Sequence, residues 1–468
     1  MIYIYFLIFI AGIFSSEKQL YLTIQMMDQV MAVDPFTLQI DESISTEFGG
    51  AMDMQNCMDY SMEMDCSMAD GCEWMMGMCM ESTNDDTMNT PHFIVLDEVN
   101  GYWFVTTIAS GYIAQFSLLD NMLIDTYFVG DAPALMSVDP KNKIVYCSRM
   151  MPMNGMGNMM PSSESNIIQA ISYSSMGLSE IENGEYEIGS PAPHGLTISD
   201  DGQEIFTASN TADWLYKIEV ETGEVTGVPL DGDVSNAPDQ TTQRLKPIQC
   251  LFVNDKIFVT CSAGPWYNPF TGESEIISGK LQMWDSINMV LLDSIELGDY
   301  SSPWHIASSP IDEVVYVALG GDNLYDTEGL AAVRFENNLL SLEWSISDSS
   351  FDTLHGIDVS NDGQTIYLSG RGDGYVHVFD NEGNYIDNLF LGTMSMLGGI
   401  AIEKKGTPNL GDLNNDNFIN IYDIVIIIEN IFDQMMDSPY HQYSGNLNED
   451  DDIDIIDIVL LVDLALSI

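Results

Sequence analysis

The chain has 468 residues, with 13 Lys or Arg against 72 Asp or Glu, so its formal net charge at pH 7 is −59. This charge makes nucleic acid an improbable class of partner and disfavours anionic membranes, because both need clustered Lys and Arg. A hydrophobic content of 46% is normal for a folded protein rather than a disordered acidic chain. We therefore expect a folded protein with an acidic, solvated surface.

The N-terminus carries an apolar stretch from Ile2 to Phe14, followed by the small residues Ser15 and Ser16. The stretch is shorter than the ~20 residues of a membrane span and matches the apolar region and cleavage site of a secretory signal, although it lacks a basic start. Residues 1–16 are thus predicted to be a signal peptide, with no membrane span after its cleavage. We expect a secreted protein, extracellular or associated with the cell surface, in which disulfides can persist.

The middle of the chain repeats one pattern. An apolar alternating run, a polar turn and a β-branched or aromatic run recur from near residues 90, 132, 192, 246, 302 and 353. Each is a β-hairpin signal, and two further strands follow it. Four short strands per repeat, at a spacing of roughly 40–60 residues, indicate a β-propeller.

A seventh inner strand, which starts near Ser395, has no hairpin partner after it. The missing strands are found in residues 19–45, so one blade is expected to combine N-terminal and C-terminal strands and close a seven-bladed ring. The predicted domain spans residues 17–404. Its repeats resemble those of YVTN-type propellers over about residues 19–403, an architecture that hosts lactonases, electron-transfer enzymes and binding proteins.

A segment rich in cysteine and methionine, residues 49–89, interrupts the ring between two predicted strands. In an exported protein its four cysteines are most easily interpreted as two disulfides with three possible pairings, and they are Cys57, Cys66, Cys72 and Cys79. A Cu(I) site built from thioethers is the alternative here and in a second methionine-rich stretch from Met150, predicted as an outer loop of the second blade. Three more cysteines are expected as buried strand residues, namely Cys147, Cys250 and Cys261.

After a short linker (405–409), residues 410–468 contain two copies of one pattern, GDLNNDNFINIYDIV from Gly411 and GNLNEDDDIDIIDIV from Gly445. The duplication closely resembles a type I dockerin, a small α domain with two EF-hand-like loops that bind two calcium ions. In such loops, oxygens at positions one, three, five, nine and twelve, and the carbonyl at position seven, surround Ca²⁺. The matching residues of the first loop are Asp412, Asn414, Asp416, Phe418, Asn420 and Asp423. Those of the second loop are Asn446, Asn448, Asp450, Asp452, Asp454 and Asp457.

The resemblance implies docking to a cohesin-like receptor and an association with extracellular polysaccharide breakdown. The residues at loop positions ten and eleven, which would contact such a receptor, are Ile421-Tyr422 and Ile455-Ile456. These pairs are more apolar than the Ser/Thr usual in dockerins.

Four histidines mark the starts of predicted inner strands. His92, His194 and His355 hold the same place in three blades, and His305 lies one position later in a fourth. Since inner strands line the central channel, these imidazoles could converge at one mouth as a metal site, with copper as one candidate, or as a ligand site. The alternative is a repeat histidine that bonds a neighbouring blade's backbone. The adhesion tripeptide at Arg371–Asp373 is expected to be a turn between strands.

Two functions remain open. The first, which we favour, is a secreted non-catalytic binding protein anchored by its calcium-loaded tail. The alternative is a propeller enzyme, lactonase-like, or a copper-handling protein with its histidine site at the axial mouth. The sequence contains no Ser-His-Asp order, phosphate loop or haem-attachment motif.

Overall fold

The computed structural model describes residues 19–48, 72–75, 78–81, 89–130, 132–150, 166–233, 236–268, 271–322, 324–405, 409–415, 418–433, 438–448, 450 and 453–467. For 72–75, 78–81, 430, 432–433 and 467 it describes the backbone alone. The predicted signal peptide, Cys57 and Cys66 of the predicted disulfides, most of the second methionine-rich stretch and two predicted calcium ligands, Asp416 and Asp452, lie outside these ranges. Of Cys72 and Cys79 only the backbone is described, so the predicted disulfides are not tested. Within them, no helix is long and apolar enough to cross a membrane.

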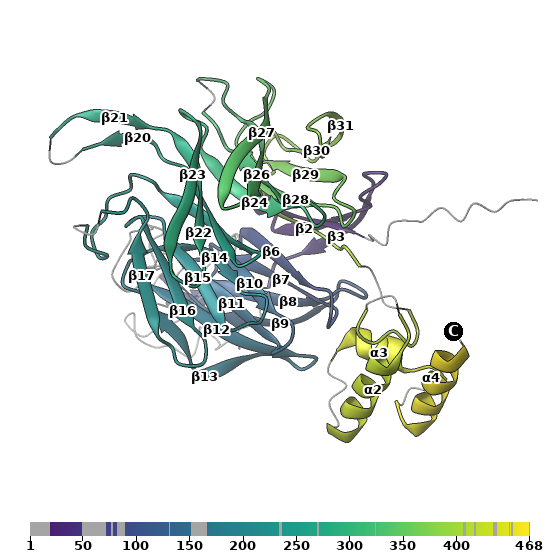
Figure 1. Cartoon of the computed structure of the whole chain (residues 1–468). Helices are drawn as coiled ribbons and strands as arrows, with labels where there is room; N and C mark the ends of the chain where they lie inside the picture. The colour runs from purple at the N-terminus through teal and green to yellow at the C-terminus, as the bar shows by residue number, and fades with distance from the viewer. Residues whose placement is uncertain are drawn as a thin grey trace, which may run out of the picture.

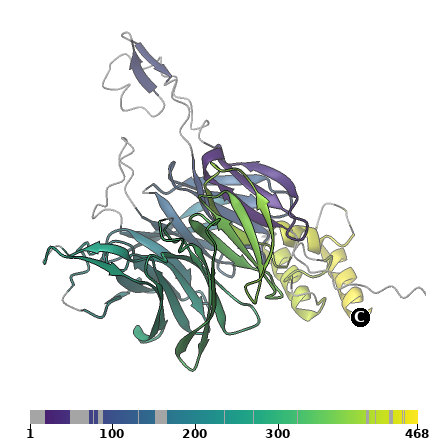
Figure 2. The ribbon, with the colours of Figure 1, turned by 90° about the horizontal axis from the view of Figure 1, so that it is seen from above.

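Seven four-stranded antiparallel sheets form the propeller (Figures 1 and 2). Their inner strands contact one another in the cyclic order β6, β10, β14, β18, β24, β28, β32 and back to β6. The predicted seven-bladed ring is confirmed. Blade 1 consists of β6 (Pro91–Asp97), β7 (Tyr102–Thr107), β8 (Tyr112–Ser117) and β9 (Leu123–Phe128). Blade 2 consists of β10 (Pro133–Asp139), β11 (Ile144–Arg149), β12 (Ile167–Ser174) and β13 (Gly177–Glu187). Blade 3 consists of β14 (Pro193–Ile198), β15 (Glu204–Ser209), β16 (Trp214–Glu219) and β17 (Val225–Pro229).

Blade 4 carries an additional hairpin, β20 (Gly264–Tyr267) with β21 (Ser274–Ile277), between its second and third strands, which the sequence reading did not predict. A separate hairpin, β4 (Cys72–Met75) with β5 (Met78–Glu81), belongs to the cysteine-rich insertion. Blade 4 consists of β18 (Pro247–Val253), β19 (Lys256–Cys261), β22 (Gly279–Asp285) and β23 (Val290–Gly298). Blade 5 consists of β24 (Pro303–Ser308), β25 (Val314–Leu319), β26 (Gly329–Glu336) and β27 (Leu339–Ser347). Blade 6 consists of β28 (Leu354–Val359), β29 (Thr365–Gly370), β30 (Tyr375–Asp380) and β31 (Tyr385–Phe390).

Blade 7 joins the two ends of the propeller domain. Its inner strand β32 (Leu397–Ile402) pairs antiparallel with β1 (Leu20–Ile24), and β2 (Gln29–Val33) and β3 (Ile40–Ser45) complete the sheet. In this register Leu22 lies opposite Ile400, and both side chains are buried in the same hydrophobic cluster. The predicted closure by N-terminal and C-terminal strands is therefore confirmed, and the ring has no open edge at its inner strands.

Every inner strand starts in the same unusual way. The residue before it has a positive φ, between 45° and 58°, although none of the seven is glycine. Its carbonyl accepts a bond of 2.8–3.3 Å from the residue that follows the blade's second strand. The inner strand then bulges within its first residues in blades 1 to 6. Bulges redirect side chains, and here they fall at the predicted histidines.

A side-chain hydroxyl compensates the backbone at these bulges. Thr106 in blade 1 accepts a bond from Phe93 N of its own inner strand (3.1 Å) and donates to the Ala134 carbonyl of blade 2 (3.0 Å). Five second strands donate to the next blade in this way, from Thr23, Thr106, Ser148, Thr260 and Ser369. Blades 3 and 5 have Ala208 and Ala318 at that position. These hydroxyls therefore join adjacent blades around the axis.

Three helices follow the propeller and lie beside it in both views (Figures 1 and 2). α2 (Ile421–Asp433) and α4 (Ile455–Ser467) come after the two predicted loops, as expected, and pack on each other around Leu413, Ile427 and Leu461. Ile427 and Leu461 face this small core, whereas other apolar residues of the two helices are exposed.

The short helix α3 (Pro439–Gly445), which was not predicted, attaches this helical module to the propeller. Tyr440 is fully buried beside Tyr21 and Trp103, and its hydroxyl donates to Glu403 (2.8 Å). The Ser438 hydroxyl caps the helix and donates to the Asn100 carbonyl (2.6 Å). Gly101 is required here, because a Cβ on it would lie 2.6 Å from the Tyr440 ring. The turn between β6 and β7 receives α3, so the module contacts the propeller face opposite the bulges.

We expect Thr106→Val to destabilise the propeller. Valine keeps the shape but leaves a buried N–H in blade 1 and a buried carbonyl in blade 2 without their partner, a loss of about 2 kcal/mol in the free energy of unfolding. Denaturant unfolding measures this loss. Thr226→Val, at an exposed position of outer strand β17, is the matched control and should change stability little. Equal effects of the two substitutions would show that the hydroxyl does not join the blades.

Candidate functional site

The structure gathers the four predicted histidines at the axial mouth, where the inner strands begin. Each lies at the bulge of its strand, so its side chain is directed towards the axis rather than between blades. The ring centroids of His305 and His355 are 4.5 Å apart, and those of His92 and His355 are 5.6 Å apart. His194 is close enough to influence the protonation of the other three. All four are buried.

The hydrogen bonds of these histidines differ from blade to blade. His194 Nδ1 donates to the Ile248 carbonyl of blade 4 (2.6 Å), so for this residue the expectation of a repeat histidine bonded to the neighbouring backbone is confirmed. His92 Nδ1 lies 2.7 Å from the Gln25 side-chain amide of blade 7. By contrast, His305 Nε2 and His355 Nδ1 are buried with no hydrogen-bond partner among the described residues. Buried nitrogens without a partner are uncommon, which makes these two candidates for bonds to a ligand that enters the mouth.

Two further donors at this mouth were not identified from the sequence. Trp304 Nε1 is buried without a partner in the described part of the chain, and the Trp304 ring lies 5.4 Å from His355. Arg371 follows the second strand of blade 6, the position that Gln25 holds in blade 7. Its Nη1 also lacks a partner, and its charge acts on His92, His305 and His355. The position of Arg371 directly after the second strand of its blade could have identified it as an axial residue, whereas the adhesion tripeptide could not.

Burial keeps the four imidazoles neutral. It lowers the pKa of His92 to about 3 and that of His194 to about 4, and it holds the pKa of His305 and of His355 well below the usual value. The neighbouring imidazoles and Arg371 lower the pKa of His92, His305 and His355 further. At neutral pH the axial cluster, defined as these four histidines with Trp304 and Arg371, therefore carries one positive charge, on Arg371.

The free polar groups of the axial cluster indicate the kind of ligand that it could bind. Nowhere in the described ranges do three or more His, Cys, Asp or Glu side chains assemble as a metal-binding group. One nitrogen each of His92 and His194 is already bonded to protein. The unpaired indole N–H and guanidinium favour a ligand that presents hydrogen-bond acceptors or negative charge.

The adhesion tripeptide does form a turn, as predicted, between β29 and β30. Its Asp373 is not free for a receptor, since it accepts a bond from His377 (3.0 Å) and from two backbone amides. Gly370 allows this turn to fold back, because a Cβ there would lie 1.9 Å from the Asp373 carboxylate. The turn thus connects the axial cluster, through Arg371, with the interface between blades 5 and 6.

The two loops predicted to bind calcium share one internal bonding pattern. In the first, Asp423 is fully buried and accepts bonds from the amides of Leu413, Asn414 and Asn420. In the second, Asp457 is equally buried and accepts bonds from the amides at the same three positions, namely Leu447, Asn448 and Asp454. The position-twelve carboxylate therefore closes each loop at the start of its helix.

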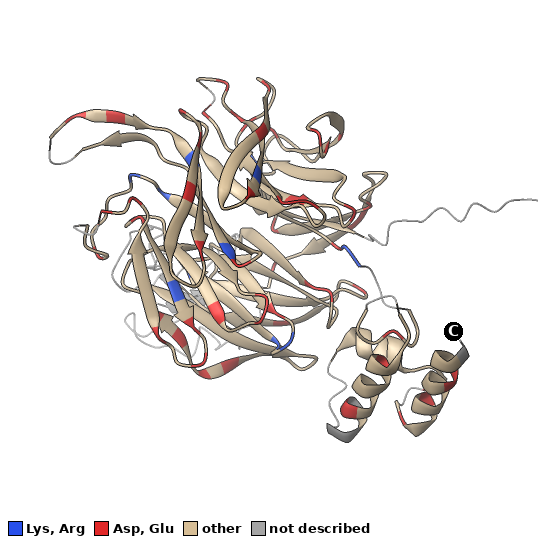
Figure 3. Ribbon diagram, in the orientation of Figure 1, with Lys and Arg blue, Asp and Glu red and all other residues tan. Residues whose placement is uncertain are grey.

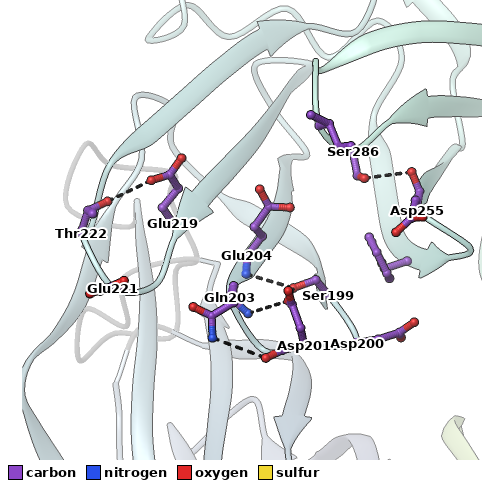
Figure 4. A pocket seen from close by; sticks show the side chains of 12 residues that line it. Ser199, Asp200, Asp201, Gln203, Glu204, Glu219, Glu221, Thr222, Asp255 and Ser286 are labelled. Atoms are coloured by element: carbon purple, nitrogen blue, oxygen red, sulfur yellow. Dashed lines mark hydrogen bonds between the residues drawn. The ribbon is translucent and has the colours of Figure 1, made fainter.

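Acidic side chains also surround a cavity of about 460 Å³ between blades 3 and 4 (Figure 4). Asp201 accepts bonds from Ser199 Oγ (2.7 Å) and Gln203 N (3.0 Å), and Glu204 pairs with Lys217 (3.0 Å). Asp201 is therefore held within a turn of the backbone, and Glu204 is held in an ion pair. Along the described chain, Asp and Glu positions are spread over the propeller and the helices, and Lys and Arg positions are few (Figure 3).

The predicted strand cysteines are confirmed as buried free thiols, Cys147 in β11, Cys250 in β18 and Cys261 in β19. Burial raises the pKa of all three, so these thiols are unreactive. In the sequence, the second methionine-rich stretch lies between β11 and β12 of blade 2.

His194 should make stability depend on pH. Its pKa in the folded protein is about 4, below the ordinary 6.5, so the unfolded chain binds the proton first and the free energy of unfolding falls as the pH drops below about 6.5. Between pH 7.5 and 5 this one residue should remove about 2 kcal/mol. Denaturant unfolding of His194→Gln should show a pH dependence smaller by that amount. A variant as sensitive to pH as the original protein would contradict the buried, neutral imidazole.

No family model and no curated protein matches this chain. Among solved structures, a putative 6-phosphogluconolactonase from Bacteroides uniformis is similar, with a TM-score of 0.53, 10% identity and coverage of 83% of this chain and 100% of that one. A putative 6-phosphogluconolactonase from Bacteroides fragilis has a TM-score of 0.50, 11% identity and coverage of 83% and 98%. The Kuenenia stuttgartiensis hydrazine synthase has a TM-score of 0.50, 11% identity and coverage of 71% and 99%. These likenesses show a seven-bladed propeller that resembles the lactonase and YVTN-type propellers.

Proposed function

We propose that this chain is an exported, non-catalytic binding protein whose propeller holds a ligand and whose C-terminal module docks, when loaded with calcium, to a cohesin-like receptor. Export by the N-terminal signal would place it outside the cell, in association with polysaccharide breakdown. The observation that carries the proposal is the bonding pattern repeated around Asp423 and Asp457, because two loops with the same closure indicate a duplicated functional module.

The chemistry of the two loops suits calcium. Asp423 and Asp457 are fully buried, and no ion pair links either of them to a Lys or Arg within the described ranges. Buried carboxylates need a compensating charge, and a set of carboxylate, amide and carbonyl oxygens is the ligand set that Ca²⁺ prefers. Two ions would be held by the loop residues predicted above, from Asp412 to Asp423 and from Asn446 to Asp457.

The residues at loop positions ten and eleven are placed to meet a receptor. Ile421, Tyr422, Ile455 and Ile456 are all exposed at the first turns of α2 and α4. Large apolar side chains that a fold leaves exposed together commonly mark interaction surfaces. We therefore propose a receptor surface that is itself apolar where it meets these helices.

The placement of the module supports separate roles for the two ends. α3 attaches it to the face at which β6 turns into β7, whereas the axial cluster lies at the opposite mouth. A ligand at the axial mouth and a receptor at the helices could then be bound at once. Gln25 and the Ile248 carbonyl bond His92 and His194 and so fix the orientation of these two rings, and neither partner is a nucleophile.

A lactonase-like enzyme with its site at the axial mouth is the second candidate. The observation in its favour is the unpaired Arg371 guanidinium beside His305 and His355, an arrangement that could bind an anionic substrate. Copper handling has less support, because the described histidines do not form a metal-binding group.

Calcium titration tests the module. After removal of bound metal with a chelator, calorimetry on the full chain should show two calcium sites per chain. Asp423→Asn should abolish or weaken at least ten-fold one of them, and Asp457→Asn the other, because each substitution removes a carboxylate from the loop. Asp463→Asn, at an exposed position of α4, is the matched control and should bind both ions unchanged.

If the original chain binds no calcium, or if both loop variants bind two ions as well as the control does, the calcium-dependent module is wrong. Circular dichroism of each variant in calcium and in chelator separates a lost site from a lost fold.

A further inference from the structure

A cavity of about 600 Å³ lies between blades 5 and 6, away from both sites above. Its walls come from the end of β27 and the turn after it, and from β30 and β31. The volume is within the usual range for small-molecule sites. Its largest wall residues are aromatic, namely Phe351, Tyr375, Phe379 and Tyr385.

The aromatic rings are fixed against one another. Phe351 meets His377 edge to face at 4.8 Å, and Phe379 meets Tyr385 in the same way at 5.5 Å. Phe351 and Phe379 are buried, whereas Tyr385 is exposed and Tyr375 half-buried. The cavity therefore has a rigid apolar floor and one aromatic ring at its rim, which can pack on the apolar face of a ring-shaped ligand.

The polar group of this wall is a histidine with one nitrogen free. His377 and Asp373 are almost fully buried, at 6% and 7% side-chain exposure, and are joined at 3.0 Å. Asp373 is itself held by the amides of Asp352 and Tyr375. Because a carboxylate only accepts hydrogen bonds, His377 Nε2 carries the proton, and in the neutral ring Nδ1 is an acceptor. That Nδ1 is buried and has no partner among the described residues, so a ligand hydroxyl would reach it only after a small displacement of the side chains that cover it.

The remaining polar groups select for the charge of the ligand. Asp348 lines the cavity and already accepts bonds from the amide and hydroxyl of Ser350. None of the described lining residues is Lys or Arg. An anion would be repelled by Asp348 and would find no cation, so the cavity suits a neutral ligand that combines an apolar ring face with several O–H donors.

We propose that this cavity binds one neutral sugar residue of a polysaccharide chain. The C–H face of the sugar packs on Tyr385 and Tyr375, and one of its hydroxyls donates to His377 Nδ1. The Asp373 carboxylate keeps His377 in the tautomer that accepts this bond. The assignment rests on the proposed association with polysaccharide breakdown, and it gives the propeller a second ligand site besides the axial mouth.

Calorimetric titration of the full chain with cellopentaose, xylopentaose, mannopentaose and maltopentaose tests the assignment. At least one should bind, and Tyr385→Ala should weaken its binding at least ten-fold. His377→Phe, which keeps a ring but removes both nitrogens, should do the same. Tyr267→Ala, at another exposed tyrosine on the hairpin of blade 4, is the matched control and should leave the affinity within two-fold.

Three results would overturn the proposal. The first is that none of the four pentaoses binds at millimolar concentration. The second is that binding survives Tyr385→Ala unchanged, a substitution at an exposed site that does not depend on refolding of the core. The third is that choline binds instead and is lost in Tyr385→Ala, which would make the cavity a cage for a cation. If the same sample binds two calcium ions but no sugar, the sugar site is wrong and the proposed calcium module is unaffected.

Discussion

The propeller depends on one hydroxyl near the end of the second strand, which links each of five blades to the next. Where the inner strand bulges, its own ladder bond is lost, and the Thr or Ser oxygen accepts the freed amide while its proton bonds the next blade's carbonyl. In these five blades, loss of that oxygen would leave buried groups of the bulge unpaired. Blades 3 and 5 bulge with alanine at this position, and in blade 5 the amide of Ile306 donates instead to the side chain of Gln249 from blade 4 (2.9 Å).

The axial cluster follows from that constraint. The bulge is the point at which an inner-strand side chain can be directed towards the axis, and four blades place histidine there. The residue after the second strand lies beside it, because its amide bonds the carbonyl that precedes the inner strand. Blades 6 and 7 use that place for Arg371 and Gln25. The repeat therefore builds a polar mouth from equivalent positions, whereas the blade interfaces supply separate cavities such as the one around His377.

The sequence predicted what is local or repeated. Turn dipeptides and alternation located six hairpins, and the unpartnered strand near Ser395 predicted closure by the N-terminus. It could not reveal Arg371 or Trp304 as axial residues, because their contacts with His355 depend on how neighbouring blades pack. Helix α3 was not predicted although Ser438-Pro439 is a recognisable helix start, because the helix is short and its stability depends on the contact of Tyr440 with the propeller. The groove between blades 5 and 6 has no sequence signature, since its walls come from strands of two repeats.

Metal analysis of the purified, untreated full chain is the most direct test of the central claim, that the propeller binds a ligand while the C-terminal module binds calcium. Elemental quantification by mass spectrometry should find two calcium ions per chain, both removable by a calcium-selective chelator, and no stoichiometric transition metal. One copper ion per chain that persists through chelation and is lost on replacement of His92, His194 or His355 by Ala would contradict the account and make the axial mouth a metal centre.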